Sequence, residues 1–164
     1  MDSIAKLLEQ KVSKSITLDA SGTTKVYSIF TVTGIVKVTA LWGVVTVVLS
    51  ANHTDCHITV ADDAADVDLS LATGLTLNTA PVGSLLIRNA AAAAVLGYHS
   101  PAAAFMSETA LDLVMKEFIV GKKTAVATNI KFSHTTSDTP SSGAILWYAT
   151  WVPMSVTGKL EAAA

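Results

Sequence analysis

The chain has 164 residues, of which 51% are hydrophobic and 15% are charged, and its formal net charge is −2. This length fits one domain, and the near-neutral balance gives no basic field to attract nucleic acid. Because charged residues are scarcer than the ~25% usual in soluble domains, we expect a partner, most simply another copy, to cover apolar surface. The single cysteine, Cys56, excludes an internal disulfide framework and is compatible with a reducing cytosol.

The N-terminal segment carries apolar residues at helical spacing. Ile4, Leu7 and Leu8 follow this pattern and predict a short amphipathic helix or arm over residues 3–13. Such a segment either frays or docks on a neighbouring subunit. Neither a secretory signal nor a membrane span is expected.

Strands are predicted through most of the following sequence. Val, Ile and Thr are stiff at χ1 and favour pleated backbone, and here they alternate with outward-facing residues. Gly34 and Gly43 permit tight reversals, so residues 30–49 are predicted to form a β-meander. The strands predicted in this part are 15–19, 25–33, 35–41, 44–50 and 57–60.

The second half is less regular. A strand is predicted at 84–88, and the alanine-rich residues 89–104 are interpreted as an excursion between strands because Gly97 and Pro101 limit helix. Residues 107–120 fit either a helix or a strand, and the surrounding strands favour the latter. Residues 125–132 and 144–152, joined by a Gly/Ser/Pro-rich loop, predict an antiparallel hairpin that ends at Pro153.

These elements predict an all-β, mainly antiparallel fold. The expected architecture is a β-sandwich or jelly-roll-like barrel with a short N-terminal helix or arm. We assign residues 1–14 to the arm and 15–164 to a single β domain.

Two clusters could bind metal. In a strand, His53, Asp55 and His57 would share a face beside Cys56, so weak zinc binding is an alternative to the preferred interpretation, a loop before a strand. Calcium is an alternative for the acidic loop, although it lacks the EF-hand order. The carboxylates of that loop are Asp62, Asp63, Asp66 and Asp68. We predict no metal site.

No catalytic or cofactor motif is present. There is no G-x-S-x-G elbow, and Cys56 and His57 would point to opposite faces of a strand. Neither G-x-G-x-x-G nor a phosphate-binding lysine loop occurs. We therefore predict no enzyme activity, no catalytic residue and no cofactor.

The last strand carries three aromatic residues. Trp147 and Trp151 share one face, and Tyr148 points to the other with Leu146. Trp42, beside Gly43, is comparable. An aromatic face can serve as a sugar platform, a core or a subunit interface. On apolarity, the candidate subunit or capsid contacts are Ile4, Leu7, Leu8, Trp147 and Trp151.

The order of these motifs resembles small structural proteins of tailed bacteriophages. Residues 30–34 (FTVTG) and 35–46 (IVKVTALWGVVT) are similar to a strand and hairpin of that family, and 80–85 (APVGSL) to its later turn and strand. Residues 139–148 (TPSSGAILWY) and 151–155 (WVPMS) resemble the hairpin that closes many of these proteins. The likeness spans about residues 24–155, with no clear counterpart for 89–120.

Two positions depart from the family pattern. Trp151 stands where tyrosine is frequent, and Met154 stands where leucine is frequent. Both replacements are conservative in packing.

The resemblance implies a non-enzymatic virion protein. It would be a decoration (cement) protein on the capsid surface, assembled in the host cytoplasm and bound as a trimer to the major capsid protein. Neither nucleic acid nor membrane is an expected partner. The alternatives are a tail, baseplate or fibre-associated protein and a carbohydrate- or calcium-binding β-sandwich module.

Overall fold

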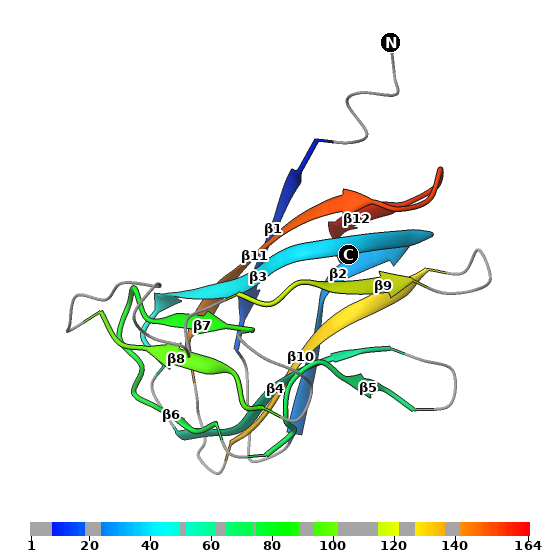
Figure 1. Cartoon of the computed structure of the whole chain (residues 1–164). Helices are drawn as coiled ribbons and strands as arrows, with labels where there is room; N and C mark the ends of the chain where they lie inside the picture. The colour runs from blue at the N-terminus through cyan, green and yellow to red at the C-terminus, as the bar shows by residue number, and fades with distance from the viewer. Residues whose placement is uncertain are drawn as a thin grey trace.

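The computed structural model describes most of the chain (Figure 1). The described residues are 8–18, 24–49, 52–61, 65–73, 75–88, 94–101, 115–121, 127–136 and 142–164. They form two antiparallel sheets that pack as a sandwich and do not close into a barrel. The all-β prediction is therefore confirmed.

Each sheet has six strands. Sheet I contains, in spatial order, β1 (Gln10–Thr17), β11 (Ala144–Pro153), β3 (Ile35–Val47), β7 (Leu85–Ile87) and β8 (Gly97–His99), with β9 (Phe118–Gly121) also paired to β3. Sheet II contains β12 (Lys159–Ala162), β2 (Thr24–Thr33), β10 (Thr128–Thr136), β4 (Asn52–Val60) and β5 (Val67–Asp68), with β6 (Leu77–Asn78) paired to β4.

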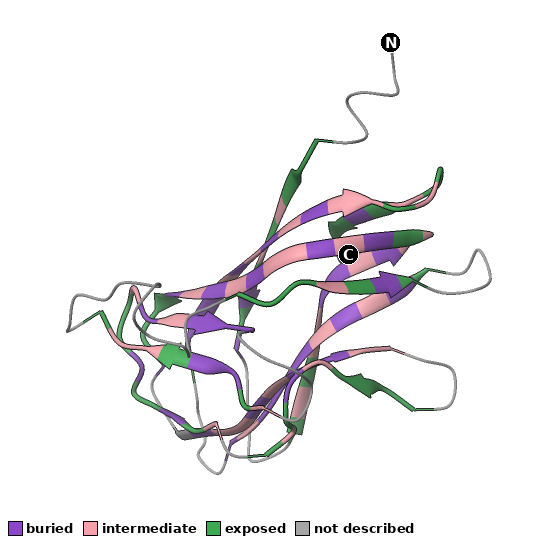
Figure 2. Cartoon of the chain, viewed as in Figure 1, coloured by how far each residue is buried: buried purple, intermediate pink, exposed green. Residues whose placement is uncertain are grey.

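The core lies between the sheets. Burial alternates along the long strands, as the banding of β3, β10 and β11 shows in Figure 2. Phe132 from sheet II and Trp147 from sheet I meet at the centre, with ring centroids 5.2 Å apart and no exposed surface on either side chain. The period of two in the sequence therefore separates core from surface as predicted.

Gly43 has a different role from the one predicted. It lies within the continuous strand β3, so the predicted reversal between 35–41 and 44–50 is wrong. Gly43 pairs with Trp147 of β11, and a Cβ there would lie 2.8 Å from Ile145 Cγ2 and 3.1 Å from the indole ring. The glycine thus makes room for the largest core side chain.

The predicted hairpins are also wrong. β2 and β3 follow one another in sequence but belong to opposite sheets, and so do β10 and β11. β11 pairs instead with β1 and β3, and β10 with β2 and β4. In both cases the consecutive strands therefore do not form a hairpin within one sheet.

Gly34 links β2 and β3, which lie in different sheets, and provides a test of this connection. Its φ is +64°, and a Cβ would lie 2.7 Å from Ser155 Oγ and 2.9 Å from the Thr157 carbonyl carbon. We expect Gly34→Ala to lower the free energy of unfolding by about 2–4 kcal/mol, from left-handed strain plus overpacking. Urea unfolding measures the loss. Gly34→Asn should be no better than alanine, because any Cβ meets the Thr157 backbone; full recovery by asparagine would contradict the steric part.

The N-terminal region joins the sheet earlier than predicted. β1 starts at Gln10 and pairs with β11, so the predicted helix over 3–13 is wrong from residue 10 onward, and 14 is not a boundary. Residues 3–7 lie outside the described part of the chain. Val12 and Ile16 alternate with exposed residues, which is the pattern of a half-buried strand. Pairing with β11 stabilises the strand, whereas a short helical pattern alone stabilises a helix only weakly.

The ends of the sheets are protected against further pairing. β5, β8 and β12 span two, three and four residues. On the longer edge strand β1, Lys14 points inward and its Nζ donates to the Ala163 carbonyl at 2.6 Å. Short edges and inward-pointing lysines both oppose strand addition.

The less regular segments are described in part. Within the predicted excursion 89–104, residues 97–99 form β8, which pairs with β7. Of the predicted strand 107–120, residues 118–120 belong to β9. The predicted strand 125–132 is observed from Thr128 onward and continues to Thr136.

Candidate functional site: the apolar outer face of sheet I

The outer face of sheet II is polar. Because Ile130 and Phe132 of β10 are buried, the intervening Lys131 points outward. Lys131 Nζ lies 3.0 Å from Asp66 Oδ2, and neighbouring strands share further polar contacts. These contacts are Thr24–Thr135 at 2.8 Å and Thr31–Asn129 at 2.9 Å. Such a face is satisfied by its own hydrogen bonds and by water.

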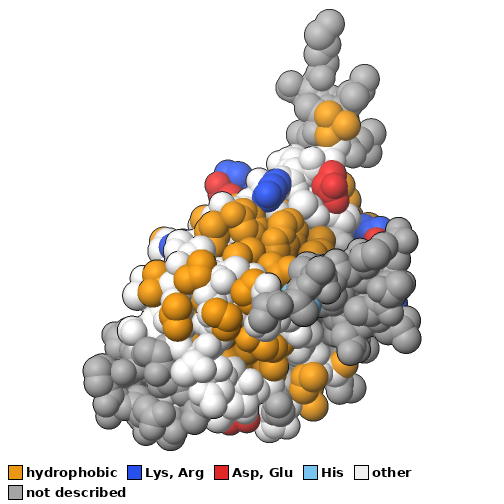
Figure 3. Space-filling model, turned by 90° about the vertical axis from the view of Figure 1, so that its left-hand side faces the viewer, with side chains coloured by type: hydrophobic (Ala, Val, Ile, Leu, Met, Phe, Trp, Pro, Cys, Tyr) orange, Lys and Arg blue, Asp and Glu red, His pale blue; other side chains and the backbone are white. Residues whose placement is uncertain are grey.

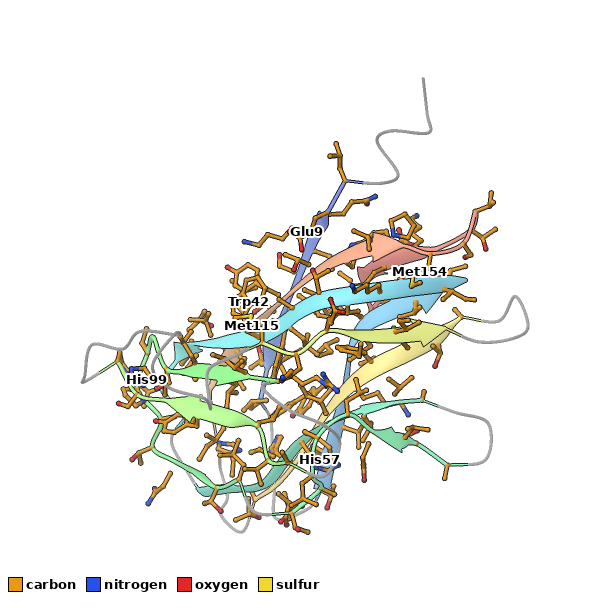
Figure 4. The ribbon with its side chains drawn as sticks, in the orientation of Figure 1. Glu9, Trp42, His57, His99, Met115 and Met154 are labelled. Atoms are coloured by element: carbon orange, nitrogen blue, oxygen red, sulfur yellow. The ribbon has the colours of Figure 1, made fainter. Side chains whose placement is uncertain are left out.

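The outer face of sheet I is apolar. Trp42 pairs with Tyr148 across β3 and β11, Val44 pairs with Leu146, and Val44 also faces Leu85 of β7. All five side chains are partly exposed. We call these residues, Trp42, Val44, Leu85, Leu146 and Tyr148, the apolar face. Figure 3 shows hydrophobic side chains gathered on this side of the molecule, and Figure 4 labels Trp42 on it.

An aromatic pair lies at the middle of the apolar face. The rings of Trp42 and Tyr148 are stacked, with centroids 5.2 Å apart and planes 19° apart. Lys11 Nζ of β1 lies 4.5 Å from the Tyr148 centroid and 5.6 Å from the Trp42 centroid. The ammonium group therefore lies within cation–π range of both rings. This cation–π contact partly shields the pair from solvent.

The rim of the face carries charges of both signs. Glu9 accepts a hydrogen bond from the Thr39 hydroxyl, and Lys37 Nζ lies 2.6 Å from Glu117 Oε2. Beside this ion pair, Ile119 and Met154 are 61% and 53% exposed and line a hollow of about 410 Å³. A second exposed apolar area therefore lies beside this ion pair, on a surface that carries charges of both signs.

The residues predicted to contact a subunit or a capsid are not part of the apolar face. Trp147 is fully buried and Trp151 is 4% exposed, so both belong to the core and present no surface to a partner. Leu8 is 62% exposed, next to β1. Ile4 and Leu7 lie outside the described residues. The alternation that put Tyr148 opposite Trp147 separated the two faces correctly, but the face chosen as contact surface is the buried one.

Residues 53–57, interpreted as a loop before a strand, lie within β4, and the zinc alternative is not supported by the positions of their side chains. His53 is fully buried, whereas His57 is half-buried with Nδ1 2.6 Å from the Asp55 carbonyl oxygen, and Asp55 has φ +53°, which breaks the alternation. Burial, followed by the charge of Asp55, raises the pKa of the Cys56 thiol to about 12, so the thiol is inert. Within the described ranges no three metal-ligating side chains converge.

The acidic loop is described only in part. Asp62 and Asp63 lie outside the described residues. Asp66 pairs with Lys131, and Asp68 is exposed in β5. The apolar face, and not this loop, therefore offers the best-defined surface for recognition.

Comparison of the chain with protein-family models, with curated proteins and with solved structures finds no match. Among the described residues there is no helix of the length and hydrophobicity needed to span a bilayer. The chemistry that can be assigned to the site is therefore that of its side chains. They provide aromatic and aliphatic surface, one cation above two rings, and a polar rim, which together make a site for binding.

Proposed function

We propose that this protein is a non-enzymatic structural protein of a tailed-bacteriophage virion, a decoration protein that binds the major capsid protein on the head surface. The observation that carries the proposal is the apolar face, which occupies one outer surface of a sandwich whose other outer surface is polar. The sequence resemblance names the partner, and the apolar face supplies the surface that such a partner would cover.

The sheet edges support contact through a face. Short terminal strands and the inward-pointing Lys14 disfavour β-strand addition. We therefore expect a partner to bind an outer face of the sandwich. The outer surface of sheet II would lose hydration at Lys131 and its polar neighbours, whereas the apolar face gains by leaving water. Because the rim carries charges of both signs, it would not strongly repel the capsid surface.

Co-sedimentation with capsids that lack the protein tests the proposal. Saturable binding to empty heads, together with a trimeric mass in solution, is the expected result. Such binding stabilises the shell by mass action, because the protein binds the assembled state alone. Binding to tails in place of heads would favour the tail alternative, and binding to neither particle would overturn the proposal.

Substitution of the aromatic pair tests the assigned surface. Trp42→Ser combined with Tyr148→Ser should weaken capsid binding by roughly 30-fold or more, because a central aromatic pair contributes about 2 kcal/mol or more to binding. Titration of capsids with labelled protein measures the change. Val26→Ser is the matched control, since Val26 is a 55% exposed apolar residue on the outer side of sheet II. Equal losses in both variants would contradict the assignment.

A carbohydrate-binding module is the second candidate, and the same aromatic pair favours it. Sugars stack on ring faces, and here the Lys11 ammonium lies over those faces. Retention on glycan beads that increases in Lys11→Ala and disappears in Trp42→Ser would support this alternative over capsid binding.

A further inference from the structure

Two histidines face one another inside the sandwich. His53 of β4 and His134 of β10 are both fully buried, and their Nδ1 atoms lie 3.1 Å apart. The ring centroids are 4.7 Å apart with planes at 70°. Neither Nε2 atom has a hydrogen-bond partner among the described residues. This side-chain contact therefore links the two strands inside the core.

The geometry limits the protonation of the pair. A short contact between two Nδ1 atoms requires one to donate and the other to accept, so two neutral rings must be in opposite tautomers. One added proton leaves a single donor between them. A second proton places two N–H groups against each other, and the contact cannot survive. Acid therefore acts on the pair in two steps, of which the second separates the rings.

The surroundings provide little stabilisation for a charged ring. Tyr27 of β2 and Phe132 of β10 stack on His134 at 5.7 and 5.9 Å, and β6 places Leu77 opposite His53. The Cys56 thiol donates to the His53 carbonyl oxygen and stays neutral. Lys25 of β2 pairs with His134 of β10, and its positive charge repels an imidazolium. The bulge with Asp55 on β4 lies in the same region.

We propose that the His53–His134 contact is an acid-sensitive latch that holds the ends of β4 and β10 together when neutral and releases them when both rings are protonated. The register shift between Ser133 and Thr135 marks where backbone pairing is already interrupted. Release there would free the ends of these strands before the rest of the sandwich unfolds. This inference rests on the core geometry alone and is independent of the proposed function.

The direction of the pH effect follows from the burial. Burial lowers the pKa of His53, and burial together with the charges of His53 and Lys25 lowers the pKa of His134 to about 4, from 6.5. Well above pH 6.5 both rings are neutral in the folded and the unfolded state, so these groups add no pH dependence there. As pH falls from 6.5 to 4, the unfolded chain binds protons at these two histidines and the folded protein does not. The free energy of unfolding therefore decreases.

Urea unfolding as a function of pH tests the latch. Between pH 7 and pH 4 we expect the unfolding constant of the wild-type protein to rise. This rise should be on the order of a hundredfold greater than the rise in His53→Leu/His134→Phe, which has no imidazole at either position. His99→Gln, which removes a histidine of β8 that lies outside the buried pair, is the matched control. Equal slopes for the wild-type protein and the double variant would overturn the latch.

Nitrogen-15 spectra of the wild-type imidazoles give a second test that needs no variant. The expected result at pH 7 is two neutral core rings in opposite tautomers, with protonation accompanied by loss of amide protection at the ends of β4 and β10. Two rings that titrate near 6.5 while that protection persists would contradict the proposal.

Discussion

Trp147→Ala is expected to lower the free energy of unfolding by about 3–5 kcal/mol, the range for removing a large aromatic side chain from a core. Trp147 is fully buried, lies on Gly43 of the neighbouring strand and touches Phe132 of the opposite sheet. Alanine would leave a void lined by both sheets, and the glycine beneath it has no side chain to fill the space. Chemical unfolding monitored by circular dichroism measures the loss.

The next residue on the same strand is the matched control. Tyr148 points to the outer side of sheet I and is partly exposed. Tyr148→Ala should therefore cost less than half as much as Trp147→Ala. If the two variants lost equal stability, the division of β11 into a core side and a surface side would be wrong.

Arg88→Met is expected to lower the free energy of unfolding by about 2–4 kcal/mol. Arg88 is 7% exposed, and its Nε donates to the Leu69 carbonyl at 3.0 Å while Nη1 donates to the Lys116 carbonyl at 2.9 Å. The guanidinium carbon also lies 4.5 Å from the Phe118 ring centroid. Methionine would fill much of the volume but leave both carbonyl groups without this donor. Urea unfolding again provides the measurement.

Two comparisons separate the hydrogen bonds from the charge. Arg88→Lys keeps the charge but cannot reproduce the two-branched geometry, so it should recover part of the loss. Lys37→Met breaks the partly exposed ion pair with Glu117 and should cost under about 1 kcal/mol. A loss in Lys37→Met as large as that in Arg88→Met would show that the buried carbonyl contacts are not the cause.

The sequence predicts the class of the fold and the faces of its long strands. Alternation along residues 35–41 and 144–152 separates core from surface, because a half-buried strand must alternate. The sequence of a single strand does not specify which other strand it pairs with. Gly34 permits a reversal within a sheet and a crossing between sheets equally well, so a crossing was predicted as a hairpin turn. Gly43 is needed because Trp147 lies against it, and that residue is far away in sequence.

The candidate site could be predicted only in part. The pattern placed Tyr148 opposite Trp147, but nothing local states which side of β11 faces the second sheet. The decisive information is the pairing of Tyr148 with Trp42 and the position of Lys11 above both rings. His134 was not connected with His53 for the same reason, since β4 and β10 meet only in the folded sheet.

The crossing topology has a consequence for how the chain acquires its structure. In sheet I, β1 and β3 are joined to each other only through β11, which is synthesised more than half a chain later. Until β11 leaves the ribosome, β1 lacks its partner in sheet I and one edge of β3 stays hydrated, although β3 can already pair with β7 and β9. Because such distant pairings form slowly, we expect folding to be largely post-translational and incomplete nascent chains to be the species most exposed to chaperones and proteases.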